Sequence, residues 1–381
     1  GTGVDPRTCR ASRIELDADA LRHNVFALTG LLPRSSGIMA VVKANAYGHG
    51  VRQLVPLLAE IGVSYFAVAT LSEALEIRTL GVDTPVLVLG PVDAECLPDA
   101  QAQGIAVTVF DPAFVSRLRT SLKSSLPRLK VHVKVDTGMH RWGIGQEEEV
   151  VDVLRILREV PKVEVEGIYT HLARADEPDV DDAERQHERF ARLLARLDAE
   201  GLTPPLRHVN NSAGFVRFPE RSYDLVRLGI SLYGIPPSPR LASSFAFLRP
   251  VLRLTAPIAQ LHLLAPGETA GYGGGFEARR PTRLAVVPLG YGDGIFRALG
   301  DGRGEALVRG RRVPIVGRVS MDALFVDVTD VPEASVGDSV VFLGTQGTEF
   351  LSPWEVADRL GTIAYEVLTQ LGPRLARVLR G

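Results

Sequence analysis

The chain of 381 residues has little cysteine, no excess of either charge and no long apolar run. Its two cysteines, Cys9 and Cys96, are too few for a disulfide framework and match no metal-ligand spacing, so we expect no metal site and a reducing, cytoplasmic location. Lys and Arg total 43 against 45 for Asp and Glu, which speaks against nucleic acid or an anionic membrane as partner. No apolar run approaches the roughly 20 residues that span a bilayer, and the first residues lack the basic-then-apolar order of a signal peptide.

The first two-thirds of the chain instead repeat an order of strand and helix. We predict strands over residues 38–42, 65–69, 85–89, 105–110, 130–135, 163–169, 207–209 and 225–227, and helices over 52–61, 73–80, 147–159 and 183–199. Strands that alternate with helices indicate parallel βαβ units. Eight such units fit a (β/α)8 barrel better than an open doubly wound sheet, which usually has fewer strands and remains the alternative.

The remainder of the chain has a different pattern. The segment Pro236-Pro237-Ser238-Pro239 interrupts any helix or central strand. Short alternating runs follow at 252–258, 283–288, 305–308, 324–328 and 339–343, with one predicted helix at 353–360. We therefore predict an α/β protein in which a barrel over residues 12–240 precedes a mostly-β domain over residues 241–381. Residues 13–17 alternate like a strand, and residues 1–17 could pair with the second domain.

Lys43 directly follows the first predicted strand. Barrels of this type carry their active sites at the C-terminal ends of the strands. A lysine desolvated there has a lowered pKa and can form a Schiff base. From its position alone, Lys43 could equally be the ion-pair partner of a neighbouring acidic residue.

The fifth predicted strand has one apolar and one polar face. Valines at 131, 133 and 135 alternate with His132, Lys134 and Asp136, so we expect the polar side chains to point into the barrel. An inward lysine needs a partner, because an unpaired buried charge is costly. Just beyond, Arg141 could clamp a carboxylate, although a solvated loop arginine is the ordinary alternative.

Three further signals follow later strands. His171 ends the sixth, Asn211-Ser212-Ala213-Gly214 follows the seventh, and Arg227-Leu228-Gly229-Ile230 closes the eighth. Small residues with free backbone N–H groups after strands seven and eight are where this fold commonly binds phosphate. Each signal is weak alone, and His171 alone would be a structural histidine. Together they indicate a phosphate-bearing cofactor beside a reactive lysine and an arginine.

These motifs also carry a family resemblance. Residues 40–50 (AVVKANAYGHG) closely resemble the pyridoxal-phosphate attachment motif of the alanine racemases. Further blocks resemble that family in the same order: 134–139 (KVDTGM), 169–171 (YTH), 211–214 (NSAG), 290–294 (GYGDG), 317–322 (GRVSMD) and 362–366 (TIAYE). The resemblance covers nearly the whole chain. It implies a barrel followed by a β domain, acting as a homodimer that interconverts L- and D-alanine and supplies D-alanine for peptidoglycan.

The resemblance also implies residue roles. Lys43 would hold pyridoxal phosphate and act as the base on the D-alanine face, while Tyr272 from the other subunit would be the base for L-alanine. Cofactor contacts would come from Lys43, Tyr47, His171, Asn211, Ser212, Arg227, Gly229, Ile230 and Tyr365, with Arg227 facing the pyridine nitrogen. Substrate contacts would come from Arg141, Tyr272 and the backbone of Met321. Lys134 matches a lysine that is carbamylated in many members, and Tyr291, Arg318 and Asp322 would support the site.

The sequence departs from the family around two of these positions. His140 and Trp142 flank Arg141 where the family usually has glycine and an aliphatic residue, and Arg174 stands where a small residue is common. We expect alanine to remain the best substrate, with serine turned over more slowly. A related decarboxylase of basic amino acids is one alternative, but it would need a cysteine motif in the second domain. A non-catalytic cofactor-binding protein is the other, but it would resemble the barrel alone.

Overall fold

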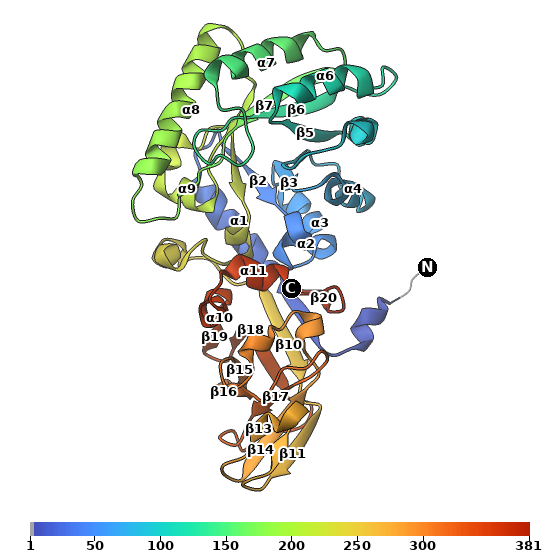
Figure 1. The fold of residues 1–381 in the computed structure, drawn as a ribbon, viewed down its shortest axis with the longest axis vertical. Coiled ribbons are helices and arrows are strands. Elements are labelled where there is room, and N and C mark those ends of the chain that lie inside the picture. The colour runs from blue at the N-terminus through green and yellow to red at the C-terminus, as the bar shows by residue number, and fades with distance from the viewer. Residues whose placement is uncertain (1–3) are drawn as a thin grey trace.

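In the computed structural model, which describes residues 4–381, a barrel and a β-rich domain are stacked end to end (Figure 1). Residues 1–3 of the segment expected to pair with the second domain lie outside the described residues. No helix of the described chain is both long and apolar enough to cross a membrane.

The first domain is a closed barrel of parallel strands, which confirms the predicted fold class. Its strands are β2 (Gly37–Val41), β3 (Tyr65–Val68), β4 (Val86–Val88), β5 (Ile105–Val109), β6 (Leu129–Lys134), β7 (Val163–Tyr169), β8 (Leu206–His208) and β9 (Leu225–Leu228). Each lies within one residue of its predicted bounds. Strands β3, β4 and β5 are buried along their whole length, as expected for strands covered on both faces.

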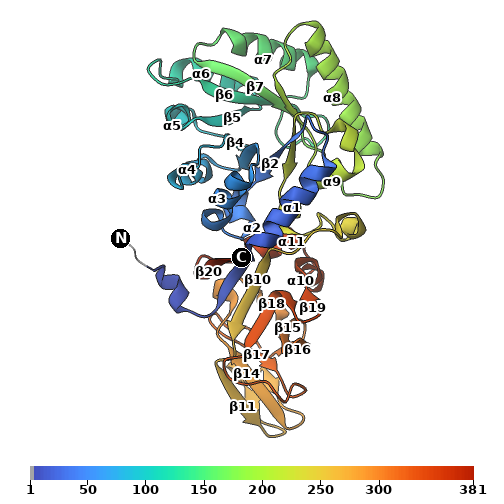
Figure 2. The same cartoon turned by 180° about the vertical axis from the view of Figure 1, so that it is seen from behind.

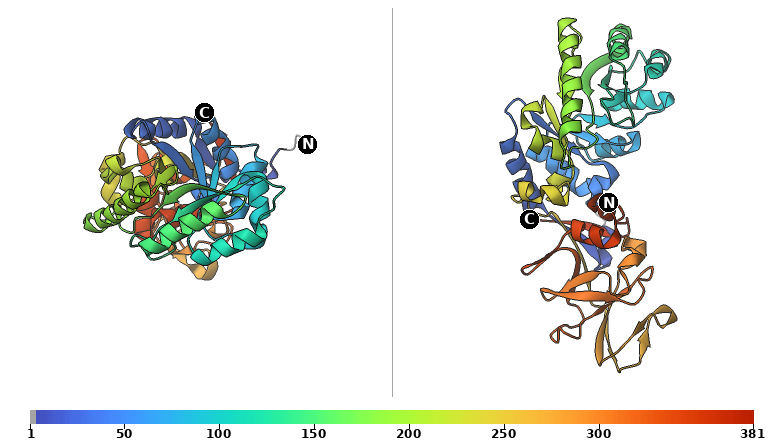
Figure 3. Two further views of the ribbon diagram at one scale, coloured as in Figure 1. Left: turned by 90° about the horizontal axis from the view of Figure 1, so that it is seen from above. Right: turned by 60° about the vertical axis from the view of Figure 1, so that its left-hand side comes forward.

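Helices surround this barrel (Figure 3, left). They are α1 (Ala18–Leu31), α3 (Val51–Ile61), α4 (Leu71–Thr79), α5 (Leu97–Gln103), α6 (Pro112–Ser121), α7 (Glu147–Glu159), α8 (Asp181–Ala199) and α9 (Ser212–Arg217). Helix α4 begins with a capping box, in which the Thr70 hydroxyl accepts from the backbone of Glu73 and the Glu73 carboxylate accepts from the backbone of Thr70. The four predicted helices correspond to α3, α4, α7 and α8, whereas α1, α5, α6 and α9 were not predicted.

The second domain is built on a mixed sheet with the order β11-β14-β17-β16-β15-β18-β10-β1-β20 (Figures 1 and 2). Its strands are β1 (Arg13–Asp17), β10 (Leu252–Pro257), β11 (Gln260–Leu264), β14 (Thr282–Val287), β15 (Glu305–Val308), β16 (Arg311–Val316), β17 (Leu324–Asp327), β18 (Ser339–Gln346) and β20 (Ala376–Arg380), with β19 (Glu349–Leu351) paired to β18 and a separate ribbon of β12 (Thr269–Ala270) and β13 (Phe276–Glu277). Strand β1 lies between β10 and β20, so the first strand of the chain pairs in the second domain.

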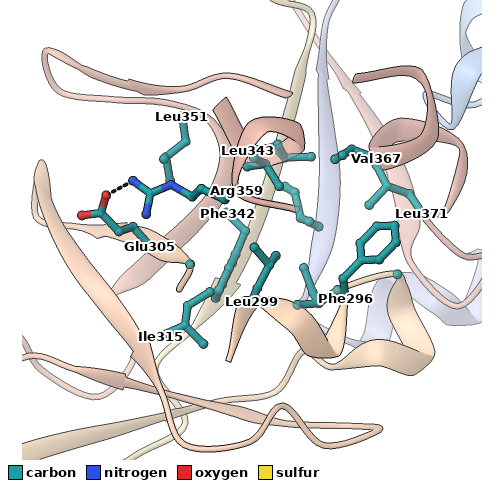
Figure 4. A pocket seen from close by; sticks show the side chains of 15 residues that line it. Phe296, Leu299, Glu305, Ile315, Phe342, Leu343, Leu351, Arg359, Val367 and Leu371 are labelled. Carbon is teal, nitrogen blue, oxygen red and sulfur yellow. Dashed lines mark hydrogen bonds and ion pairs between the residues drawn. The ribbon is translucent and has the colours of Figure 1, made fainter. Parts of the chain in front are cut away.

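Two helices, α10 (Pro353–Leu360) and α11 (Ala364–Thr369), lie where the two domains meet (Figure 3, right). Helix α10 covers the predicted residues and is capped by the Ser352 hydroxyl, which accepts from Glu355 N–H at 3.0 Å. Beneath the two helices, aliphatic and aromatic side chains such as Leu299 and Phe342 line a small apolar cavity, which an ion pair between Glu305 and Arg359 borders (Figure 4). This packing attaches the helices to the β domain, so they can face the barrel.

Candidate active site

Lys43 lies immediately beyond β2, at the C-terminal mouth of the barrel. Burial lowers the pKa of its amine, and the nearby charge of Arg141 lowers it further, while Glu73 acts in the opposite direction. Lys43 therefore lies at the end of the first barrel strand, the position that the sequence predicted. Its environment favours the neutral, nucleophilic form of the amine.

The turn after Lys43 has an unusual backbone. Residues 44–47 all have φ between 52° and 57°, in the left-handed region, which costs roughly 1–2 kcal/mol for each residue with a side chain. Glu73 holds this turn, because its carboxylate accepts from Ala44 N–H at 2.7 Å and from Ala69 N–H at 2.8 Å. Asn45 Oδ1 also accepts from Val51 N–H at 2.8 Å. The strained turn thus lies beside Lys43, and hydrogen bonds to α4 and α3 hold it in place.

A pocket with an empty volume of about 1500 Å³, part of which is open to solvent, extends from Lys43 over the mouth of the barrel. It brings together every residue predicted to contact the cofactor: Lys43, Tyr47, His171, Asn211, Ser212, Arg227, Gly229, Ile230 and Tyr365. These residues come from β9 and the turns after β2, β7, β8 and β9, with Tyr365 contributed by α11. Four turns, strand β9 and helix α11 therefore converge on one cavity.

One part of the pocket is polar and closely packed. A Cβ atom on Gly229 would lie 2.5 Å from the Tyr47 hydroxyl, so only glycine leaves room there. The Ser212 hydroxyl shares a hydrogen bond of 2.7 Å with the Ser231 hydroxyl, and Asn211 caps α9 by accepting from Gly214 N–H. This region offers hydroxyl and backbone N–H groups suited to a phosphate.

Another wall of the pocket contains the Arg227 guanidinium, which is 3% exposed. Its Nη2 donates to the carbonyls of Thr170 at 2.8 Å and Val209 at 2.9 Å and lies 3.4 Å from His171 Nδ1. Burial lowers the pKa of Arg227 to about 10, so it stays cationic at neutral pH. Burial and this cation hold the pKa of His171 well below its ordinary value, so His171 is neutral.

Lys134 and Arg141 lie near this pocket but do not line it. Burial, followed by the charges of Arg227 and Arg141, lowers the pKa of Lys134 to about 7, so a large part of its amine is neutral at physiological pH. The Trp142 ring lies 5.4 Å from the Arg141 guanidinium carbon and 5.8 Å from Lys134 Nζ. A neutral amine is the form that can be carbamylated, and carbamylation of Lys134 stays a prediction.

Apart from Tyr365, the predicted residues of the second domain lie outside the pocket. Tyr272, in the turn after β12, is 73% exposed, and Met321 is 52% exposed. Asp322 pairs with Arg374 at 2.8 Å, and Tyr291 N–H donates to the Ser320 carbonyl. Arg318 lies along the turn that carries Tyr272, because a Cβ on Gly273 would meet its Nη1 at 3.3 Å. One chain alone therefore does not bring Tyr272 to Lys43.

Sequence analysis missed several residues of the pocket. Met139, Asp176 and Trp354 were given no role, although Met139 closes the block 134–139, and Trp354 anchors the pocket edge by donating from its indole N–H to the Pro236 carbonyl at 2.7 Å. Helix α10 was predicted, but its pattern alone does not say which domain its tryptophan faces. Arg174 is exposed and does not line the pocket.

Comparisons with known proteins agree with this architecture. The family model described as alanine racemase, N-terminal domain, matches residues 16–237, and the model for the alanine racemase C-terminal domain matches residues 251–379. The alanine racemase of Desulfosudis oleivorans is 39% identical over 373 residues, covering 96% of this chain and 95% of that protein. Alanine racemase 2 of Bacillus subtilis is 38% identical, covering 97% and 95%.

A solved structure extends the likeness to three dimensions. The crystal structure of alanine racemase from Bacillus anthracis with bound L-Ala-P has a TM-score of 0.91 and 36% identity, covering 98% of this chain and 95% of that one. Sequence and fold thus agree over both domains. The chain belongs to the alanine racemase family.

Proposed function

We propose that this chain interconverts L- and D-alanine with pyridoxal phosphate held in the Lys43 pocket. The observation that carries the proposal is the convergence of a partly buried amine, a polar cradle and a buried arginine in one cavity of a chain from this family. The product D-alanine would serve peptidoglycan synthesis. A cytoplasmic location is part of the proposal and is supported by two free cysteines.

The pocket residues fit this cofactor chemically. Tyr47, Ser212 and the backbone of Gly229 and Ile230 would hold the phosphate, where the absence of a side chain on Gly229 leaves space beside the Tyr47 hydroxyl. Lys43 would attach the cofactor, and Arg227 would face its ring nitrogen. When bound, pyridoxal phosphate withdraws electrons from an attached amino acid and makes its Cα proton removable.

The chain's own residues would then exchange that proton on two faces of the substrate. Lys43, with its lowered pKa, would take or return it on the D-alanine side. Tyr272 from the partner subunit of a homodimer would do so on the L-alanine side. Arg141 and the backbone of Met321 would hold the substrate carboxylate, because a guanidinium pairs with a carboxylate in a bidentate manner.

Isotope exchange tests this function directly. The full chain with its cofactor, incubated with L-alanine in D2O, should give D-alanine carrying deuterium at Cα. Release of CO2 would instead indicate a decarboxylase, and retention of unlabelled L-alanine would indicate a protein that only binds the cofactor. The Lys43→Ala variant, measured in parallel, gives the rate of exchange without the proposed base.

A further inference from the structure

A chain of hydrogen bonds runs from Arg227 through the interior of the barrel. Arg227 Nη1 lies 2.8 Å from His208 Nδ1, His208 Nε2 lies 3.0 Å from His132 Nδ1, and His132 Nε2 lies 2.8 Å from Glu166 Oε1. Both histidines are completely buried. Glu166 also accepts a hydrogen bond from the Tyr65 hydroxyl.

The donors and acceptors of these hydrogen bonds can be arranged in only one direction. A guanidinium has no acceptor, so Arg227 donates and His208 Nδ1 must accept. Burial and the charge of Arg227 hold the pKa of His208 well below its ordinary value, so His208 is neutral and carries its proton on Nε2. His208 therefore donates to His132 Nδ1, and His132 donates from Nε2 to the Glu166 carboxylate.

Glu166 is ionised, as the final acceptor must be. Burial would raise its pKa, but the hydrogen bonds from His132 and Tyr65 lower the pKa to about 2. The carboxylate is the only fully charged acceptor along this chain of bonds. Together with the Arg227 donor at the other end, it therefore sets the direction of the two imidazole protons between them.

The backbone around Glu166 is shaped for this contact. Strands β6 and β7 pair Val131 with Val165 and then His132 with Gly167, so Glu166 is the extra residue of a β-bulge. Lys130 pairs with Glu164 before the bulge, so in an unbroken strand Glu166 would pair with His132; the bulge instead places Gly167 opposite His132 and leaves Glu166 as the extra residue. A Cβ on Gly167 would also lie 2.3 Å from His132 Nδ1, so glycine makes room for the ring.

We propose that Glu166 is a positioning residue for Arg227, acting as the terminal acceptor that fixes the tautomers of His132 and His208. With the opposite tautomer, His208 Nδ1–H would face the Arg227 donor at 2.8 Å, and the guanidinium would lose this contact. The inference rests on the proposed function, in which Arg227 faces the cofactor ring. Its structural part concerns protons that can be observed without any reaction.

Histidine-selective ¹⁵N labelling of the full chain tests the direction. In the wild type, the Nδ1 atoms of His132 and His208 should resonate as unprotonated nitrogens and their Nε2 atoms as protonated ones, with signals assigned from His132→Phe and His208→Phe. Protonated Nδ1 on His208 would overturn the proposal. The same spectra remain informative if the wild type does not racemise alanine, a result that would overturn the proposed function instead.

Two substitutions at one position connect the tautomers to function. Glu166→Leu removes the acceptor and should change the His208 signals and lower kcat about 10- to 100-fold, with little change in KM, as for partners that orient active-site groups. Glu166→Gln keeps an acceptor oxygen and should restore the tautomers and most of kcat. Glu164→Leu, the matched control, removes an exposed carboxylate from the same strand and should leave both measurements unchanged. Equal losses in Gln and Leu variants, or unchanged tautomers in the Leu variant, would contradict the proposal.

Discussion

The barrel mouth and the surface around Tyr272 differ in how complete they are within one chain. Arg227 and Tyr47 are buried, and each cofactor-contact residue lines one cavity. Tyr272, Tyr291 and Met321, which we call the Tyr272 surface, are instead 73%, 43% and 52% exposed. Exposed aromatic and thioether side chains of this kind favour contact with another protein surface. We infer that a protomer completes the cofactor cradle alone but not the second catalytic base.

Replacing Lys43 should give the largest effect, because it removes both cofactor attachment and one base. Lys43→Ala should lower kcat/KM for alanine racemisation by at least about 10⁴-fold. Borohydride treatment followed by intact-mass measurement should add the reduced cofactor to the wild type but not to this variant. The exposed Lys123→Ala serves as the control and should behave as the wild type. Reductive attachment at another lysine would remove Lys43 from its proposed role.

Mixing two inactive variants tests whether the Tyr272 surface serves a second chain. Tyr272→Phe should lower kcat about 10²- to 10⁴-fold, because it removes a proton-transferring group. When Lys43→Ala and Tyr272→Phe chains are unfolded and refolded together, half of the dimers should be mixed. Each mixed dimer regains one intact site, so activity should recover to about a quarter of wild type.

Refolding each variant alone gives the baseline for this experiment, and neither should recover. If Lys43 and Tyr272 of the same chain formed the site, mixed dimers would contain no intact site. Activity that stays at the baseline while native mass spectrometry shows mixed dimers would therefore place both bases in one chain.

Features that depend on local sequence were predicted, whereas features that depend on distant contacts were not. The barrel strands and the position of Lys43 followed from local apolar runs, because a buried parallel strand is recognisable over a few residues. The left-handed turn at residues 44–47 did not follow, since it depends on the Glu73 carboxylate from another element. The bulge at Glu166 and the orientation of Trp354 also depend on contacts with residues far away in the sequence. Tyr272 is exposed in the single chain, and its proposed role came from family resemblance alone.

Acid should lower the stability of the barrel more than that of the β domain. His49 is fully buried against Tyr233, and burial lowers its pKa to about 4, whereas the only histidine of residues 241–381, His262, is exposed. The unfolded chain binds a proton at this histidine below pH 6.5 and the folded chain does not, so the free energy of unfolding falls between about pH 6.5 and 4. The loss should be about 3 kcal/mol.

Urea unfolding at pH 7 and pH 4 measures this loss. His49→Phe keeps the stacking on Tyr233 and removes the titrating group, so its stability should fall less than that of the wild type over this interval, by about 3 kcal/mol. His262→Phe is the matched control in the β domain and should titrate as the wild type does. An equal fall in all three proteins would assign acid sensitivity to other groups.

Replacing Trp142 should give the smallest effect, because its exposed ring contacts Arg141, the arginine proposed to bind the substrate carboxylate. Its ring is 41% exposed and lies 5.4 Å from the Arg141 guanidinium carbon. An exposed cation–π contact contributes about 0.5–1 kcal/mol, so Trp142→Leu should raise the KM for alanine about two- to fivefold and leave kcat nearly unchanged. Phe350→Leu, an exposed aromatic of the β domain, should change neither constant. A fall in kcat with unchanged KM would mean that Trp142 acts on the proton-transfer step rather than on carboxylate binding. The loop that carries Trp142 would then belong to the catalytic part of the barrel mouth.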